Sequence, residues 1–82
     1  MRQILTHSAQ LGLILASRRR AAKLSQRTLA GKLAMSQNRL SELEANPGTI
    51  TIERLLELAN ILGLELSVQD KPPVSLSSKT QW

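Results

Sequence analysis

The strongest constraint on the fold is a set of three hydroxyl residues, each standing directly before apolar residues with helical spacing. Ser25, Ser36 and Thr51 occupy positions where a helix N-cap is expected, because a hydroxyl oxygen accepts a hydrogen bond from the free amides of the first helical turn. Helices that restart this often along a chain are short. The sequence therefore predicts an all-α domain built from a few short helices.

The apolar residues predict three helices in the first half of the chain, at residues 8–22, 25–35 and 36–45. Arg18 interrupts the apolar stripe of the first helix. Each stripe covers one side of its helix, so the helices are expected to pack around one small core. The stripe residues are Leu11, Ile14, Leu15 and Ala22 in the first helix, Leu29, Ala30 and Leu33 in the second, and Leu40 and Leu43 in the third.

A stop signal and a new start define a fourth helix. The segment Asn46-Pro47-Gly48 ends the third helix, because the proline ring blocks continuation and glycine turns freely. After Thr51 the chain carries its strongest apolar stripe, and Gly63 closes this helix as a left-handed C′ residue. The predicted unit is a compact four-helix domain over residues 8–63, preceded by an arm over residues 1–7. The stripe of the fourth helix consists of Ile52, Leu55, Leu56, Ala59 and Leu62.

After the fourth helix, the period of the apolar residues changes from 3.6 to 2, which is typical of a β-strand. The sequence predicts one such strand over residues 64–70. A single strand has no partner within this chain, and its unpaired backbone favours pairing with the same strand of a second protomer. We therefore expect a symmetric homodimer. The residues of the predicted dimer strand that share one face are Leu64, Leu66 and Val68.

The last segment, residues 71–82, has too little apolar surface to order itself and is predicted to be a flexible tail. It ends in Trp82, the only aromatic residue of the chain. Short segments often bind protein pockets through an aromatic anchor, so Trp82 is a candidate contact with a protein partner.

Composition argues against enzymatic chemistry. The chain contains no Cys, and His7 is its only imidazole, so zinc clusters, disulfides and thiol catalysis lack the side chains they need. We expect no catalytic residues, no metal and no cofactor. No apolar run approaches the roughly 18 residues of a membrane span, and no signal pattern opens the chain. The expected location is the cytoplasm, with no membrane partner.

The 11 basic and 6 acidic residues are unevenly distributed along the chain. Residues 17–40 contain no carboxylate, and all the acidic residues follow this segment. Such segregation favours contact between one side of the domain and a polyanion, although a solvated basic face is the alternative for the run Arg18-Arg19-Arg20. The basic residues of the segment are Arg18, Arg19, Arg20, Lys23, Arg27, Lys32 and Arg39.

The second and third helices, joined by a tight turn, predict a helix-turn-helix, in which the second helix of the pair enters the DNA major groove. Leu40 and Leu43 must face the core, so the polar residues between them face outward. A Gln or Asn amide both donates to and accepts from adenine. Glu42 also faces outward, but its carboxylate repels phosphate even though it can accept from a cytosine amine, so it is not included. The predicted base-reading residues are Gln37, Asn38 and Ser41.

The starts of the same two helices are predicted to hold DNA phosphates. The third position of each helix carries Thr28 or Arg39 instead of the Glu of a capping box, which leaves the positive helix end free. Backbone amides and nearby guanidinium groups would then contact phosphate oxygens. The predicted phosphate-binding residues are Ser25, Gln26, Arg27, Ser36 and Arg39.

The segment LSQRTLAGKLAMSQNRLSELEANP resembles the helix-turn-helix of the phage-repressor-like (Cro/C1, or XRE) family, and matches to that family run from about Leu11 to Gly63. The resemblance implies a lambda-repressor-like fold and sequence-specific binding to double-stranded DNA. It also implies a structural ion pair between Arg19 and Glu44, which would orient the first helix against the third without touching DNA.

Within that family, the sequence is most similar to HipB-type antitoxins, the repressors that partner HipA-like serine/threonine kinase toxins. Four features carry the similarity: Gln10-Leu11, the stop Glu44-x-Asn46-Pro47, the strand over 64–68, and the polar tail ending in Trp82. The resemblance implies a dimer that pairs these strands, binds palindromic operators and engages the toxin through Trp82. It also implies that Gln26 contacts a phosphate.

Three positions depart from the family pattern. Lys23 and Ala34 stand where the family usually has Gly, and Gly31 lies inside the second helix. If Lys23 is left-handed, it is strained by about 1 kcal/mol. At Ala34, either the same strain applies or the turn avoids positive φ.

Two other functions are compatible with the sequence. One is a stand-alone repressor without a toxin partner. The other is a protein-interaction module that keeps the helix-turn-helix fold and no longer binds DNA, since a fold alone does not fix function.

Overall fold

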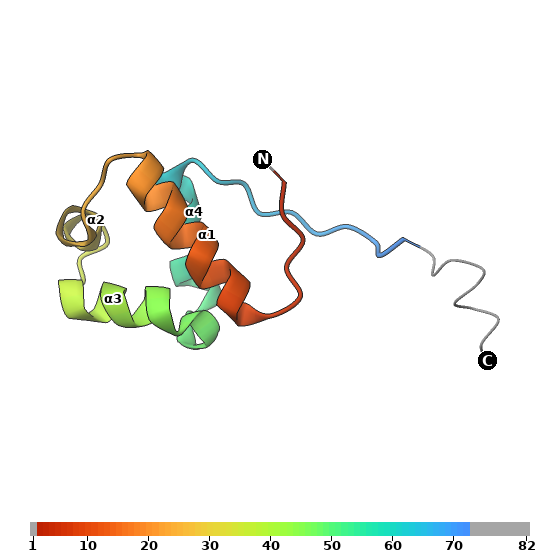
Figure 1. Ribbon diagram of the computed structural model, residues 1–82, viewed down its shortest axis with the longest axis horizontal. Coiled ribbons are helices and arrows are strands. Elements are labelled where there is room, and N and C mark those ends of the chain that lie inside the picture. The colour runs from red at the N-terminus through yellow and green to blue at the C-terminus, as the bar shows by residue number, and fades with distance from the viewer. Residues whose placement is uncertain (1, 73–82) are drawn as a thin grey trace.

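The computed structural model describes residues 2–72, and over that range it contains four α-helices and one 3₁₀ turn. Figure 1 shows α1 crossing the domain, with α2 and α3 packed to one side and α4 behind it. The predicted all-α, four-helix fold is confirmed. The elements are α1 (Ser8–Ala21), α2 (Gln26–Lys32), α3 (Gln37–Ala45), the 3₁₀ turn η1 (Pro47–Thr49) and α4 (Ile52–Leu62).

Three of the helices begin at the hydroxyl residues that the sequence singles out. Each hydroxyl oxygen accepts a hydrogen bond from the backbone N–H three residues ahead, which satisfies one amide that the helix itself leaves without a partner. The bonds run from Thr28 N to Ser25 Oγ at 3.0 Å, from Arg39 N to Ser36 Oγ at 3.1 Å, and from Arg54 N to Thr51 Oγ1 at 3.1 Å.

The start of α1 uses an amide side chain in place of a hydroxyl. Gln10 Oε1 accepts hydrogen bonds from the backbone N–H of Thr6 at 2.6 Å and of His7 at 3.1 Å. His7 is the N-cap residue of this helix. Gln10 therefore fixes the direction in which the N-terminal arm enters the domain.

Left-handed residues follow α1, α2 and α4. Gly63 has φ 71°, as predicted, but Lys23 and Ala34 also have positive φ values of 60° and 55°. After each of them the next amide bonds back across the helix end, as Met35 N does to Ala30 O at 3.0 Å. The left-handed conformation costs an L-residue about 1–2 kcal/mol, so both non-glycine turns are strained.

The turn at Ala34 also corrects a predicted helix end. The second helix was expected to reach about Met35, but α2 ends at Lys32. Helical periodicity continues through Leu33, which is the C-cap residue and is buried at 3 % exposure. The apolar stripe thus extends one residue beyond the helix. The buried side chain of Leu33 keeps the helical spacing of apolar residues, although the backbone is no longer helical there.

The core is aliphatic and made mostly of leucine. The predicted core positions are all buried: Leu29 and Ala30 of α2, its C-cap residue Leu33, and Leu40 and Leu43 of α3. Each fully buried leucine contributes about 1.5–3 kcal/mol relative to an exposed one. Within residues 2–72 the cluster that joins α1, α2, α3 and α4 consists of Leu15, Leu29, Ala30, Leu33, Leu40, Leu58 and Leu62.

The buried face of α4 differs from the predicted stripe. Leu58 is 1 % exposed, whereas Ile52 and Leu56 of the predicted stripe are 61 % and 48 % exposed. The residues that face the core follow the spacing i, i+3, i+4 and i+7 from Leu55, and Ile52 and Leu56 lie beside that face. Residues 2–72 therefore leave an apolar strip of α4 exposed.

Residues 64–70 form no strand in the single chain that the structure describes. Leu64 is half-buried, and Leu66 and Val68 are 38 % and 100 % exposed. The side chain of Arg2 donates to Gln69 Oε1, which places the N-terminal arm beside this segment. A strand needs a neighbouring strand, and none lies within residues 2–72, so the pairing between protomers stays a prediction.

Candidate nucleic-acid interface

The α3 helix presents a polar face to solvent because two leucines fix its inner face. Leu40 and Leu43 are 1 % and 2 % exposed. On the other side, all three predicted base-reading residues are exposed. Over residues 2–72, no hydrogen bond involves the side chain of Gln37, Asn38 or Ser41. Their donors and acceptors are therefore available to an external partner.

The ion pair between Arg19 and Glu44 joins α1 to the last turn of α3. Arg19 Nε lies 2.7 Å from Glu44 Oε2, and Arg19 Nη2 lies 3.3 Å from Glu44 Oε1. The two side chains are only 11 % and 8 % exposed. A two-point contact between a planar guanidinium and a carboxylate fixes orientation as well as distance. The pair therefore sets the angle between α1 and α3.

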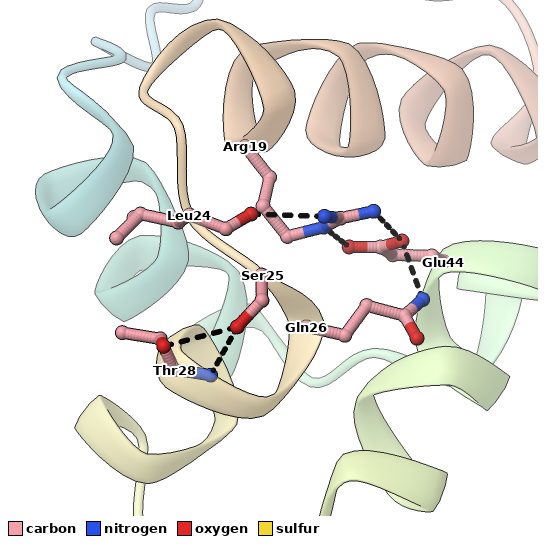
Figure 2. A network of polar contacts seen from close by, with 6 residues as sticks. All are labelled: Arg19, Leu24, Ser25, Gln26, Thr28 and Glu44. Atoms are coloured by element: carbon pink, nitrogen blue, oxygen red, sulfur yellow. Dashed lines mark hydrogen bonds and ion pairs between the residues drawn. The ribbon is translucent and has the colours of Figure 1, made fainter.

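The same ion pair is part of a larger network, drawn in Figure 2. Arg19 Nη1 also donates to the backbone carbonyl of Leu24 at 3.0 Å, just after the left-handed turn at Lys23. Glu44 Oε1 accepts a second hydrogen bond, from Gln26 Nε2 at 3.0 Å. The network connects the end of α1, the first residue of α2 and the last turn of α3.

Gln26, a predicted phosphate contact, thus has an internal partner. Since a carboxylate only accepts hydrogen bonds, the amide nitrogen must face Glu44, and Figure 2 shows the Gln26 oxygen directed away. Gln26 is half-buried at the start of α2. A phosphate contact from this side chain would use its remaining N–H group.

The other predicted phosphate contacts lie at the two helix starts. Ser25 and Ser36 use their hydroxyl oxygens as caps for α2 and α3. Arg27 is exposed on the first turn of α2. Arg39, in the first turn of α3, has Nη1 3.5 Å from Glu42 Oε1 in an exposed contact. The structure places all of these residues on or beside the helix-turn-helix, and nothing in it tests their contact with phosphate.

Part of the basic run serves the interior of the protein. Arg18 Nη2 donates to the carbonyl of Leu62 at 3.1 Å, and Arg19 is buried in the network described above. Arg54 of α4 likewise donates to the carbonyl of Leu33 at 2.9 Å. These arginines satisfy carbonyl groups at helix ends. The exposed cations of residues 17–40 are therefore fewer than the sequence indicates: Arg20, Lys23, Arg27, Lys32 and Arg39.

Gly12 is a residue that sequence reasoning missed. A Cβ atom at this position would clash with the backbone oxygen of Glu44 and would lie 3.2 Å from Pro47 Cγ. Only glycine lets α1 approach the end of α3 this closely. The one signal in the sequence is a glycine on the inner stripe of a helix, three residues before Leu15.

The predicted dimer strand lies apart from the helix-turn-helix in the chain. The dimer-strand residues Leu64, Leu66 and Val68 belong to the segment after α4. Trp82 lies outside the described residues. Within residues 2–72, no group of three His, Cys, Asp or Glu side chains is placed to hold a metal ion. No helix in the same range is long and apolar enough to cross a membrane.

An α2–α3 pair in a four-helix domain, with a polar outer face on α3, defines a helix-turn-helix DNA-binding protein. The helix-turn-helix family model matches residues 15–69, which is more than half of the chain, and the protein therefore belongs to the Cro/C1-type (XRE) helix-turn-helix family. Its family and fold are those of a DNA-binding transcription regulator. Comparison with curated proteins and with solved structures found no match.

Proposed function

We propose that this transcription regulator is a dimeric repressor that reads palindromic operators and also acts as the antitoxin of a HipA-like serine/threonine kinase toxin. The observation that carries the DNA-binding part is the outer face of α3. The side chains of Gln37, Asn38 and Ser41 are exposed, and over residues 2–72 they have no internal hydrogen bonds. The helix itself is fixed by two buried leucines. A helix held so rigidly suits base reading, which requires donors and acceptors at fixed positions.

In this function Gln37, Asn38 and Ser41 contact base edges in the major groove. The phosphate contacts at the two helix starts set the register of the protein on the duplex, and they carry no sequence information. Gln26 and Arg27 act from α2. Ser36 and Arg39 act from α3, and Ser25 contributes through the amides next to it. Arg19 of α1 and Glu44 of α3 keep these two helices at the angle that DNA binding requires.

The dimer is supported by apolar side chains that lie exposed in the described part of the chain. Ile52, Leu56 and Val68 are 61 %, 48 % and 100 % exposed. A second copy of the chain would cover this surface and would pair its strand over 64–70 with that of the first. A two-fold axis would then place two α3 helices about one DNA turn, roughly 34 Å, apart. Such a dimer binds a palindromic site.

The antitoxin role is supported by features that lie outside the DNA-reading face. Gln10 caps α1, and Pro47 is buried where α3 ends, so two of the four HipB-type features have structural roles here. The other two are the segment 64–68 and the tail with Trp82, both outside the helix-turn-helix. In this proposal the tail engages the kinase while α3 stays on the operator.

The first experiment is selection of bound sites from a random duplex library at about 0.15 M salt, where non-specific attraction is reduced. We expect a two-fold symmetric motif whose half-sites lie about one helical turn apart. Light scattering on the same sample reports the oligomeric state. A folded dimer that enriches no motif would contradict the repressor function.

Two measurements separate the alternatives. Purification at native expression level, followed by mass spectrometry, shows whether a HipA-like kinase accompanies the protein. Its absence would favour a stand-alone repressor. The slope of DNA affinity against salt concentration tests the interaction module, because real phosphate contacts release counterions and make the slope steep. A flat slope would favour a module that no longer binds DNA.

A further inference from the structure

We propose that Glu42 is a specificity-determining residue that selects cytosine at one position of the operator. The inference rests on the proposed function, because it concerns the sequence that α3 reads. Glu42 is not among the residues expected to read bases, since its negative charge is repelled by the DNA phosphates. The position and the surroundings of its side chain favour a base-reading role.

The first observation is the place of Glu42 on α3. With 100° between successive residues, the direction opposite Leu40 and Leu43 is occupied by Asn38, and Ser41 and Glu42 lie on either side of it. The side chain of Glu42 is 69 % exposed. Glu42 is thus a neighbour of Asn38 on the outer face, and a docking of α3 centred on Asn38 brings the carboxylate of Glu42 close to base edges.

The second observation is the contact between Glu42 and Arg39. Arg39 Nη1 lies 3.5 Å from Glu42 Oε1, and the side chains are 48 % and 69 % exposed. The positive charge reduces the repulsion between the carboxylate and the DNA backbone. An exposed pair at this distance is weak, so both groups can exchange partners when DNA arrives. Arg39 then moves to a phosphate and the carboxylate turns to a base.

The chemistry of the major groove restricts which base that is. A carboxylate only accepts hydrogen bonds, so it is repelled by the acceptors N7 and O6 of guanine and O4 of thymine. Adenine carries an amine beside its own acceptor N7, whereas cytosine presents its N4 amine and no acceptor of its own in the groove. Cytosine is thus the base that a carboxylate at this position favours.

The experiment compares the wild-type protein with Glu42→Gln on the selected operator and on duplexes that carry each of the other base pairs at every position. We expect a cytosine preference at one position of each half-site, reduced by about five- to tenfold in the variant. Affinity for random duplex should rise at the same time, by about two- to threefold, because a negative charge is lost. A base-reading role for Glu42 therefore predicts two opposite changes in the variant: a smaller preference for cytosine and a higher affinity for random duplex.

The matched control is Glu57→Gln on α4. Glu57 also forms an exposed i, i+3 pair, with Arg54 at 3.1 Å, so the control removes the same charge from the same kind of contact. It should leave every base preference unchanged. If Glu42→Gln raises affinity equally for all sequences, Glu42 acts only through its charge and the inference is wrong. A wild-type protein with no motif at all would instead contradict the proposed function.

Discussion

The backbone oxygen of Glu44 occupies the space that a side chain on Gly12 would need. The contact brings α1 against the end of α3 at the same place where Arg19 holds the Glu44 carboxylate. Glu44 is thus held twice, through its backbone by close packing and through its side chain by charge. The position of the DNA-reading helix depends on both.

The first prediction concerns this close approach. Gly12→Ala should lower the free energy of unfolding by about 2–3 kcal/mol, because the new methyl group meets a backbone atom that has no room to move. Urea denaturation followed by circular dichroism measures the loss. The matched control is Gly31→Ala, since a Cβ on Gly31 has no atom within 4 Å. That variant should be more stable by about 0.5–1 kcal/mol, as expected for alanine in a helix. Equal effects of the two variants would argue against tight packing at Gly12.

The second prediction concerns the strained turn after α1. Lys23→Gly should raise the free energy of unfolding by about 0.5–1 kcal/mol, because relief of the left-handed strain exceeds the extra entropy of glycine in the unfolded chain. Lys32→Gly, the same change at the last residue of α2, should lower it by about 0.5–1 kcal/mol. Thermal melting of both variants gives the two signs. A loss of stability in Lys23→Gly would show that this turn carries no strain.

The third prediction concerns the two ion pairs of α3. Glu44→Ala should cost about 3–5 kcal/mol of stability, because it leaves the guanidinium of Arg19 in a site only 11 % exposed. Glu42→Ala breaks an exposed pair in the same helix and should change stability by about 0.5 kcal/mol or less. Denaturant titrations compare them at one salt concentration. Similar losses of stability for both variants would mean that the buried Arg19–Glu44 contact stabilises the fold no more than an exposed ion pair does.

The fourth prediction concerns base reading. Gln37→Ala should reduce discrimination at one base pair by about 1–3 kcal/mol, because one pair of amide contacts is lost. Affinities for the selected operator and for single-base variants of it give the number. If the affinity falls by the same factor on every duplex, Gln37 does not read a base.

The fifth prediction concerns the tail. Removal of Trp82 should weaken binding to a HipA-like kinase and leave operator affinity unchanged, because in the proposed function the two partners use separate parts of the chain. Titration calorimetry with the kinase and a separate DNA titration measure the two affinities. Ser77→Ala, in the same tail, serves as the control. Unchanged kinase affinity without Trp82 would remove it from the interface.

Local signals were sufficient to predict most of the fold. Ser25, Ser36, Thr51 and Gly63 act through bonds to their own neighbours in the chain, so their roles are visible in the sequence. The end of α2 was misplaced, because the conformation of Ala34 is set by the packing of the helices that it joins. The residue pattern of a short segment does not determine how these helices pack.

The candidate site could be predicted only in part, for the same reason. The outer face of α3 follows from the spacing of Leu40 and Leu43. The contact of Gln26 with Glu44 joins residues 18 apart and depends on the angle between helices, which no local pattern contains. The sequence also does not predict the exposure of Ile52. Ile52 lies three residues before Leu55, so helical spacing alone places it on the apolar stripe although its side chain lies beside the buried face.

The leucine core has a practical consequence for every solution study of this protein. With no Tyr or Phe in the chain and a single Trp at its very end, the helical domain contains no fluorophore. Tryptophan emission from this sequence comes from Trp82 alone. An emission change on adding a partner that has no tryptophan of its own, such as DNA, would therefore report events at the tail, free of any contribution from the helical domain.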